Sequence, residues 1–148
     1  MYDFETAVAR IRAAREALDA TAEDVMLVGR ADGLFYGETD MAEIVRRIAA
    51  FAQAGADCLY APGVSTPEQI RAVVKAAAPK PVNVLMGPAA KLGFDALADL
   101  GVRRISVGGA LALAAWSGFT TAVDGLAAER FDGFAFTVSH AELGKLFG

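Results

Sequence analysis

Apolar residues along the chain follow two patterns, short uninterrupted runs and longer stretches with helical spacing. The short runs are bounded by glycine or proline, as in strands buried on both faces of a parallel sheet. They cover residues 25–28, 58–61, 81–86 and 104–107. The longer stretches carry apolar residues three and four positions apart, and they cover residues 3–20, 41–54, 66–78, 90–100, 110–128 and 140–147. The pattern predicts a helix, four strand–helix units and a tail.

Several of these helices carry their own start signals. Asp3 and Thr66 are residue types that accept hydrogen bonds from the free N–H groups of a first turn. Gln69 lies three residues after Thr66, and Glu142 lies three residues after Ser139. Both spacings match the capping box, in which the two side chains each bond the other's backbone. We therefore expect helices to begin directly after Asp3, Thr66 and Ser139.

Strands that alternate with helices at this spacing are parallel and joined by right-handed crossovers. The predicted fold class is therefore α/β, with a single domain over residues 1–148 and a helical tail from about 129 to 148. Two architectures fit: an open doubly wound sheet of the flavodoxin type, and half of a (β/α)₈ barrel, which needs about 250 residues when complete. Residues 29–33, after the first strand, lack the glycine-rich phosphate motif of many doubly wound folds.

Composition and charge exclude several classes of function. The chain has 148 residues with 18 acidic and 14 basic side chains, a net charge of −4. This balance argues against non-specific nucleic-acid binding, which needs clustered cations. One cysteine, Cys58, and one histidine, His140, exclude an internal disulfide, a cysteine-rich zinc site and a multi-histidine metal site within one copy. We expect Cys58 to be a small buried apolar residue rather than a nucleophile paired with His140.

Residues 105–123 contain no charged side chain, and their length alone would suit a membrane span. Glycine and hydroxyl residues interrupt this stretch, which favours a buried strand, a glycine turn and a packed helix. Residues 2–18 are charged and amphipathic, unlike a secretory signal. We therefore expect a cytoplasmic protein that does not associate with a membrane.

Both candidate architectures bind ligands at the carboxyl ends of their strands. Arg30 and Asp32 follow the first strand there. The planar guanidinium matches a carboxylate or phosphate, so Arg30 is a candidate anion clamp; the alternative is a structural pair with Asp32 or an exposed arginine. Asn83 lies inside the third strand, where a buried amide must find partners. It would bind a substrate carboxylate or hydroxyl, or else bond neighbouring backbone.

Glycines follow the last two predicted strands: Gly87, which precedes Pro88, and the pair Gly108 and Gly109. Such loops hold phosphates at helix N-termini in many barrels, although tight turns between strand and helix need the same residues. The acids near the strand ends are Asp32 and Asp40. Because a hard divalent cation binds several oxygen ligands, the chain supplies no obvious metal site of its own.

Four segments, in this order, resemble the isocitrate lyase and phosphoenolpyruvate mutase superfamily. They are VGRAD at 28–32, AGADCLYAPG at 54–63, PVNV at 81–84 and LGVRRISVG at 100–108. The resemblance runs over nearly the whole of this chain. In the family's catalytic domain, the matching part is the second half, strands five to eight. Members of the family are (β/α)₈ barrels that bind Mg²⁺ and make or break C–C or C–P bonds next to a carboxylate. The resemblance thus favours a half-barrel.

The resemblance also implies roles for particular residues. Arg30 matches the arginine that contacts the substrate's anionic group, and Asn83 matches the asparagine that binds a substrate carboxylate. With Asp32 and Gly108 at the same strand ends, they form the predicted substrate site for a small anionic carboxylate. The family's metal-holding acids and catalytic loop belong to the first half of the barrel. Mg²⁺ is therefore implied as a cofactor, but its ligands are not expected in this chain.

The sequence departs from part of the family at three positions. Pro62 stands near the place where methylisocitrate-lyase-like members carry a glutamate. Leu85 and Gly87 replace hydroxyl residues that lyases use after the asparagine. These departures argue against methylisocitrate cleavage as the specific activity.

Three hypotheses follow. The first is a Mg²⁺-dependent C–C lyase or phosphonomutase for small 2-oxo or 2-hydroxy carboxylates, of which this chain is the C-terminal half, inactive by itself. The second is a non-catalytic half-barrel that self-associates, as a homo-oligomer or with a complementing half, because its open sheet edges would otherwise be exposed. The third is a flavodoxin-like module that binds phosphate at Gly108 and Gly109.

Overall fold

The computed structural model describes residues 1–21, 23–38, 40–87, 91–134 and 138–147. Its internal contacts divide the chain into two compact units, Met1–Gly108 and Gly109–Gly148. The sequence predicted one domain with a tail from about residue 129. In the structure the long apolar helix at Ala110–Ala127 groups with the tail, because that helix contacts the tail segment at residues 132–134.

The first unit contains a parallel sheet, which confirms the predicted α/β class. Within the described residues the sheet has four strands in the order β1-β2-β3-β4. The strands are β1 (Val28–Arg30), β2 (Cys58–Tyr60), β3 (Val82–Leu85) and β4 (Arg104–Ser106). Each pairs in parallel with the strand that follows it along the chain. This order is that of consecutive strands in a barrel wall; in the flavodoxin type the order would reverse at a switch point.

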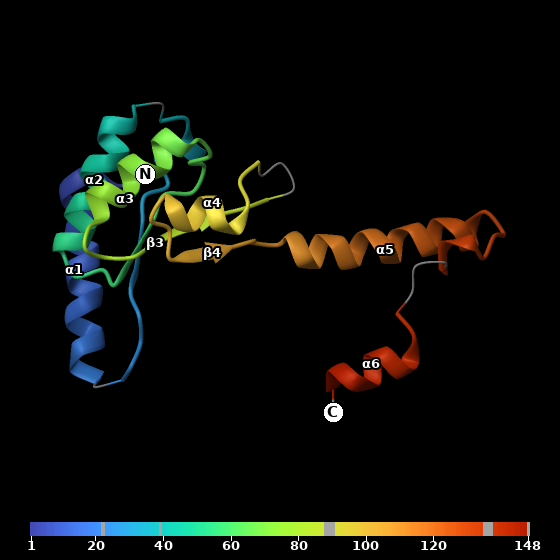
Figure 1. The fold of residues 1–148 in the computed structure, drawn as a ribbon. Coiled ribbons are helices and arrows are strands. Elements are labelled where there is room, and N and C mark those ends of the chain that lie inside the picture. Colours follow the sequence, from blue (N-terminus) through green and yellow to red (C-terminus); the bar gives the residue numbers. More distant parts are fainter. Residues whose placement is uncertain (22, 39, 88–90, 135–137, 148) are drawn as a thin grey trace. The chain divides into compact units, whose positions relative to one another are not determined.

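Helices follow the strands as the apolar spacing predicts (Figure 1). Those of the first unit are α1 (Phe4–Thr21), the 3₁₀ turn η1 (Gly33–Tyr36), α2 (Met41–Gln53), α3 (Pro67–Ala77) and α4 (Phe94–Asp99). Those of the second unit are α5 (Ala110–Ala127), the 3₁₀ turn η2 (Asp132–Phe134) and α6 (His140–Phe147). Predicted and observed ends differ most at α4, predicted over 90–100; residue 90 lies outside the described part.

The predicted start signals are confirmed at three helices. Thr66 Oγ1 accepts a hydrogen bond from the backbone N–H of Gln69 at 3.3 Å, and the Gln69 side chain bonds back, so the capping box is complete. Ser139 and Glu142 make the same reciprocal pair at the start of α6. Asp3 Oδ1 accepts from a backbone N–H in the first turn of α1 at 2.8 Å. Each bond satisfies a donor that the helix itself leaves without a partner.

The apolar core lies between one face of the sheet and helices α2, α3 and α4. Its largest fully buried apolar side chains are Ile44, Ile48, Leu59, Ile70, Val73, Val82, Val84 and Leu97. Gly29 lets α2 approach β1 closely, because a Cβ at this position would lie 3.1 Å from the Cβ of Phe51 on α2. The opposite face of the sheet carries the alternate residues of each strand.

The first strand lies further along the chain than predicted. We expected residues 25–28 to form a strand buried on both faces, but Val25 and Met26 are exposed and the strand begins at Val28. Pairing begins here because the carbonyl of Leu27 accepts the backbone N–H groups of Asp57 and Cys58. Val28 and Arg30 are exposed while Gly29 between them is buried, so β1 is covered on one face alone.

Asp57 joins α1 to the start of the sheet. Its Oδ2 accepts from Arg15 Nη1 at 2.9 Å and from the backbone N–H of Leu27 at 2.7 Å. A carboxylate that receives both a guanidinium and a backbone donor forms charge-assisted bonds, which are stronger than neutral ones. This acid of the AGAD segment therefore fixes the position of the first helix relative to β1 and β2.

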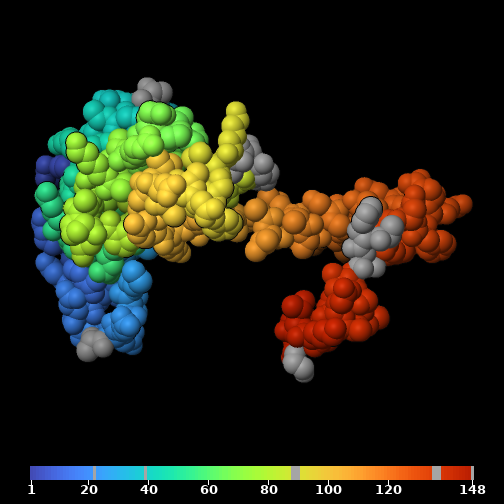
Figure 2. Space-filling view, viewed as in Figure 1, coloured from blue at the N-terminus to red at the C-terminus, as the bar shows by residue number. Residues whose placement is uncertain are grey.

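The second unit contains most of the charge-free stretch, residues 109–123. Along α5 the described side chains are exposed apart from the partly buried Ala110 and Ala122, and Gly125 is the one buried residue; α5 is orange in Figure 2. We expected this helix to be packed, and within the described residues it is not. By length and composition α5 is the one described helix that could cross a membrane, and 6% of its apolar window is buried.

Candidate functional site

A row of polar side chains crosses the sheet on the face away from the core. Arg30 pairs with Tyr60, Tyr60 pairs with Asn83, and Asn83 pairs with Arg104. Residues in register across parallel strands share a face, and Leu59 and Val82, next to this row, point into the core instead. The sheet therefore presents two guanidinium groups, a phenol and an amide together.

Arg30 is the last residue of β1 and stands at the carboxyl edge of the sheet. Its Nε donates to Asp32 Oδ1 in an ion pair, so the structural pairing weighed from the sequence is present. The guanidinium carbon also lies 5.6 Å from the centroid of the Tyr60 ring, within the range of a cation–π contact. The side chain remains 50% exposed. Asp32 and Tyr60 thus orient a guanidinium whose outer nitrogens are within reach of an anion.

Asn83 is fully buried, and its partners are side chains of the neighbouring strand. Its Nδ2 donates to Ser106 Oγ at 3.0 Å, and its Oδ1 accepts from Arg104 Nη1 at 2.9 Å. The sequence left open a ligand or neighbouring backbone as the partner of this amide. The described structure satisfies it through β4, so its orientation is set before any ligand binds.

Cys58 lies on the same face and is 1% exposed. Burial raises the pKa of its thiol, and the nearby positive charge of Arg104 opposes this rise in the pKa. A thiol that stays protonated at neutral pH is a poor nucleophile. The prediction that Cys58 is a buried apolar residue is confirmed.

Cys58 should therefore react slowly with a thiol reagent such as DTNB at pH 8 in the native protein. Reaction requires local opening, and an opening free energy of about 3 kcal/mol corresponds to about 100-fold protection relative to the unfolded chain. The rate is measured by absorbance, with the same protein in urea as the control. Equal rates in the two conditions would contradict the burial of this thiol.

The other predicted site residues occupy turns. Gly108 follows β4 with φ of +54°, a left-handed conformation that favours glycine. Gly109 precedes α5 and provides no side-chain cap. Gly87 follows β3, and Pro88 lies outside the described residues. Asp40 caps α2, where its Oδ1 accepts from the backbone N–H of Ala42 at 2.8 Å. Gly108 thus ends the first unit, whereas Asp40 has a structural role.

The described residues do not assemble a metal site. No group of three or more histidine, cysteine, aspartate or glutamate side chains among them is placed to hold an ion. Asp32 is engaged by Arg30, and Asp40 caps a helix. A Mg²⁺ ion would find too few oxygen ligands here. That the family's metal ligands belong to the other half of the barrel stays a prediction.

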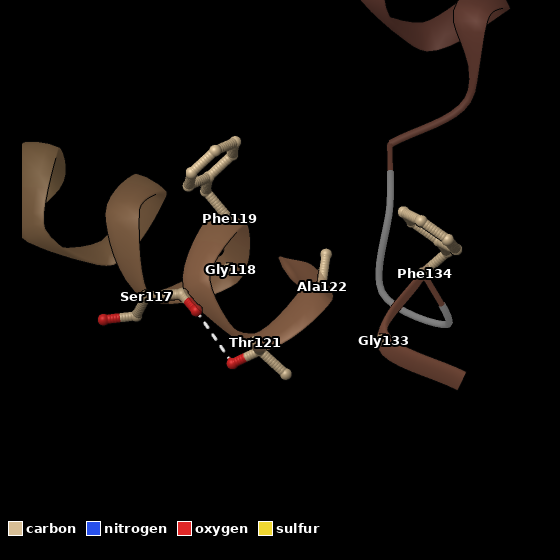
Figure 3. A pocket seen from close by; sticks show the side chains of 7 residues that line it. All are labelled: Ser117, Gly118, Phe119, Thr121, Ala122, Gly133 and Phe134. Atoms are coloured by element: carbon tan, nitrogen blue, oxygen red, sulfur yellow. Dashed lines mark hydrogen bonds between the residues drawn. The ribbon is translucent and has the colours of Figure 1, made fainter. Parts of the chain in front are cut away.

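A cavity of about 430 Å³ lies in the second unit and is a different kind of site. Its lining residues are Ser117, Gly118, Phe119, Thr121, Ala122, Gly133 and Phe134 (Figure 3). None is charged, and the Thr121 hydroxyl is used inside α5, where it donates to the Ser117 carbonyl at 2.8 Å. This cavity therefore has no group that would bind a carboxylate.

Two residues of the row, Tyr60 and Arg104, and Ser106, which bonds Asn83, were not singled out from the sequence. Alternation along residues 104–106 places Arg104 and Ser106 on one face. Only the pairing of Asn83 with Arg104 shows that this is also the face of Asn83. Polar residues at both ends of the short strand β4 were the signal that could have identified Arg104 and Ser106.

Comparisons with known proteins agree with this geometry. The sequence model of a family described as phosphoenolpyruvate phosphomutase matches residues 1–127. The whole chain is similar to 54% of a predicted lyase/mutase from Burkholderia cenocepacia J2315, with 37% sequence identity and a TM-score of 0.92. A second structure from the same organism, a predicted phosphonomutase, is similar to 84% of this chain. The match covers 51% of the phosphonomutase chain, with 37% identity and a TM-score of 0.75.

The whole chain is also similar to 52% of a 2,3-dimethylmalate lyase, with 25% identity and a TM-score of 0.83. No curated protein matches the sequence closely enough to count as a relative. The chain thus spans about half the length of the solved structures that it resembles.

Proposed function

Because the chain belongs to the phosphoenolpyruvate phosphomutase family, we propose that it is the anion-binding half of an enzyme that makes or breaks a C–C or C–P bond. The proposed substrates are small 2-oxo or 2-hydroxy carboxylates. One observation carries the proposal: Arg30 and Asn83 lie in one row on the face of the sheet away from the apolar core. The resemblance to the isocitrate lyase and phosphoenolpyruvate mutase superfamily, inferred from four segments, is confirmed by the family match and the relatives.

The row offers donors and positive charge where parallel sheets bind ligands. Arg30 would bind a carboxylate or phosphonate through the outer nitrogens of its guanidinium, a bidentate geometry that lysine does not provide. Asn83 would donate from Nδ2 to a second anionic oxygen. Asp32 would hold the Arg30 side chain in place through the ion pair. Two such contacts orient a small substrate, which is a large part of catalysis in a reaction of this kind.

The relatives support the substrate class without selecting one reaction. One is a 2,3-dimethylmalate lyase and another is a predicted phosphonomutase. The resemblance implies Mg²⁺, whose usual role is to stabilise charge that develops on an enolate-like oxygen. The described residues do not form a site for it, so we place its ligands in the other half of the barrel.

The proposal is tested on the full-length protein that contains this chain. A panel of 2-oxo and 2-hydroxy acids and phosphonopyruvate is incubated with Mg²⁺, and ¹H and ³¹P spectra record any cleavage or rearrangement. We expect turnover of at least one member and its loss after chelation of the metal. If no member is converted and none raises the melting temperature, the folded protein is not such an enzyme.

A second candidate function has its own supporting observation. Large apolar side chains of α5 are exposed: Leu111, Leu113, Trp116, Phe119, Val123 and Leu126. A soluble chain that exposes such a surface tends to cover it with a partner. The second proposal is therefore a non-catalytic half-barrel that self-associates. A native mass of one 15.4 kDa chain in solution would count against it, and a mass of two or more chains together with no turnover would favour it.

A further inference from the structure

We infer that Arg104 is a positioning residue that fixes the orientation of the Asn83 amide, so that Asn83 acts as a hydrogen-bond donor at the carboxyl edge of the sheet. The inference rests on the proposed function, because it specifies the kind of ligand atom that Asn83 accepts. It concerns a residue that the resemblance does not single out.

The two ends of the Asn83 amide meet different residues of β4. Oδ1 accepts from Nη1 of Arg104, the first residue of the strand, at 2.9 Å. Nδ2 donates to Oγ of Ser106, the last residue of the strand, at 3.0 Å. Arg104 pairs with Asn83 itself, whereas Ser106 pairs with Leu85, two residues further along β3. The amide oxygen is thus held toward the amino end of the sheet and the nitrogen toward its carboxyl end.

The chemistry of arginine makes this orientation unambiguous. A guanidinium has donors and no acceptor, so the atom of Asn83 that faces Arg104 must be the oxygen. A reversed amide would place an NH₂ group against the guanidinium and leave Oδ1 facing the Ser106 hydroxyl. Because Asn83 is fully buried, leaving one of its groups without a partner would be costly. The described part of the chain records no ion pair for Arg104, so no carboxylate there competes with Asn83.

The fixed amide has a consequence for ligand selection. Nδ2 carries two protons, and one of them is donated in the hydrogen bond to Ser106 Oγ. The second has no acceptor among the described residues, and because Asn83 is fully buried, a ligand at the carboxyl edge reaches it only if neighbouring side chains move aside. A carboxylate oxygen satisfies it, whereas a ligand that presents an N–H there meets another donor. Arg104 would therefore favour anionic oxygen ligands without touching them.

The orientation is tested first without a ligand. Asn83 is the one asparagine of this sequence, so selective ¹⁵N-asparagine labelling gives a side-chain signal that Asn83→Ala identifies in the full-length protein. We expect two sharp, slowly exchanging NH₂ resonances. Arg104→Met should shift them and speed their exchange with water by about 10-fold or more, since one anchoring bond is lost. Arg104→Lys, which also only donates, should restore them.

The neighbouring arginine provides the control. Arg103 donates to the backbone carbonyls of Ala98 and Val102, outside the row, and Arg103→Met should leave the Asn83 resonances in place. If Arg104→Met does not fold, Arg104→Gln makes the same comparison, because a glutamine amide can donate or accept and does not select one orientation. Unchanged Asn83 resonances in the Arg104→Met or Arg104→Gln protein would overturn the inference.

The ligand test uses oxalate and oxamate in the presence of Mg²⁺. Oxalate is a planar dianion with the shape of the enolate of a 2-oxo acid, and oxamate replaces one carboxylate by a neutral amide. We expect Arg104→Met to weaken oxalate binding by about 10- to 100-fold, the effect of one hydrogen bond to a charged group, and to weaken oxamate less. Arg104→Lys should stay within a few-fold of the parent.

The two measurements separate the two ideas. If the parent protein does not bind oxalate although Asn83 is held by Arg104, the proposed function fails and the positioning role stands. If oxalate binds and Arg104→Met alters neither the Asn83 resonances nor the affinity, the positioning role is wrong and carboxylate binding stands. A purely structural role of Arg104 would lower the melting temperature while leaving the preference for oxalate over oxamate unchanged.

Discussion

On the proposed function, replacing Arg30 by alanine is expected to reduce kcat/KM of the complete enzyme for a 2-oxo or 2-hydroxy carboxylate by about 10²- to 10³-fold. A preorganised group that meets developing negative charge contributes this much when it is removed alone. The Arg30 guanidinium is held by Asp32 and by the Tyr60 ring, so little reorganisation is needed when substrate binds. Arg30→Lys should recover part of the loss, because it keeps the charge but not the bidentate geometry. Steady-state kinetics on the purified protein measure the effect.

Arg71→Ala is the matched control, since Arg71 is an exposed arginine on α3 and should leave kcat/KM unchanged. Arg30 is half exposed, and its pair with Asp32 adds little to stability. The Arg30→Ala protein should therefore unfold near the parent's temperature, so that a loss of activity is not a loss of fold. If the Arg30→Ala protein is folded and has the parent's kcat/KM, Arg30 does not contact the substrate.

Local signals in the sequence predicted most of the helices and their ends. The capping box of Thr66 and Gln69 needs a spacing of three residues and the right side chains, and both are visible in the sequence. The apolar faces of α2 and α3 repeat every three or four residues, and their buried members are Ile44, Ile48, Ile70 and Val73. Such features depend on neighbours within one or two turns, which is why they transfer to the structure.

The polar row could not be read from the sequence to the same extent. Arg30 and Asn83 were identified as separate candidates on separate strands, but the contact between Asn83 and Arg104 joins residues 21 positions apart. That contact depends on the register of β3 against β4. Register is set by packing over the whole sheet, and a shift of one residue would turn Arg104 to the other face. The candidate residues were therefore predictable, whereas their network was not.

The apolar helix α5 shows a limit of a different kind. Its apolar composition predicted a packed helix, since a helix that is apolar on all sides is normally buried. In the described residues the side chains of α5 are exposed instead. An apolar sequence pattern indicates that a helix surface is favourable to bury, but it does not identify the residues that pack against it. The family match over residues 1–127 includes α5, so the helix belongs to the family's scaffold.

Replacing Ile48 by alanine is expected to lower the free energy of unfolding of the first unit by about 2–5 kcal/mol. Ile48 is fully buried in α2, in the core cluster that includes residues of α3 and the sheet. The loss combines the transfer of three methyl or methylene groups to water with the cavity that remains. Urea unfolding followed by labelling of Cys58 measures the effect, because this thiol is buried in the same unit and reacts only when the unit opens.

A graded series of substitutions tests whether lost packing causes the decrease in the free energy of unfolding. Ile48→Val removes one methylene group and should lower this free energy by about 0.5–1.5 kcal/mol. Leu146→Ala, at a 76% exposed position in α6, should change it by less than about 0.5 kcal/mol. Trp116 is the one tryptophan of the sequence and lies in α5, so its fluorescence follows the second unit independently. If Ile48→Ala moves the Trp116 transition as far as the Cys58 transition, the two units unfold together. If it moves neither, the core between the sheet and α2 does not stabilise the first unit as the buried side chains require.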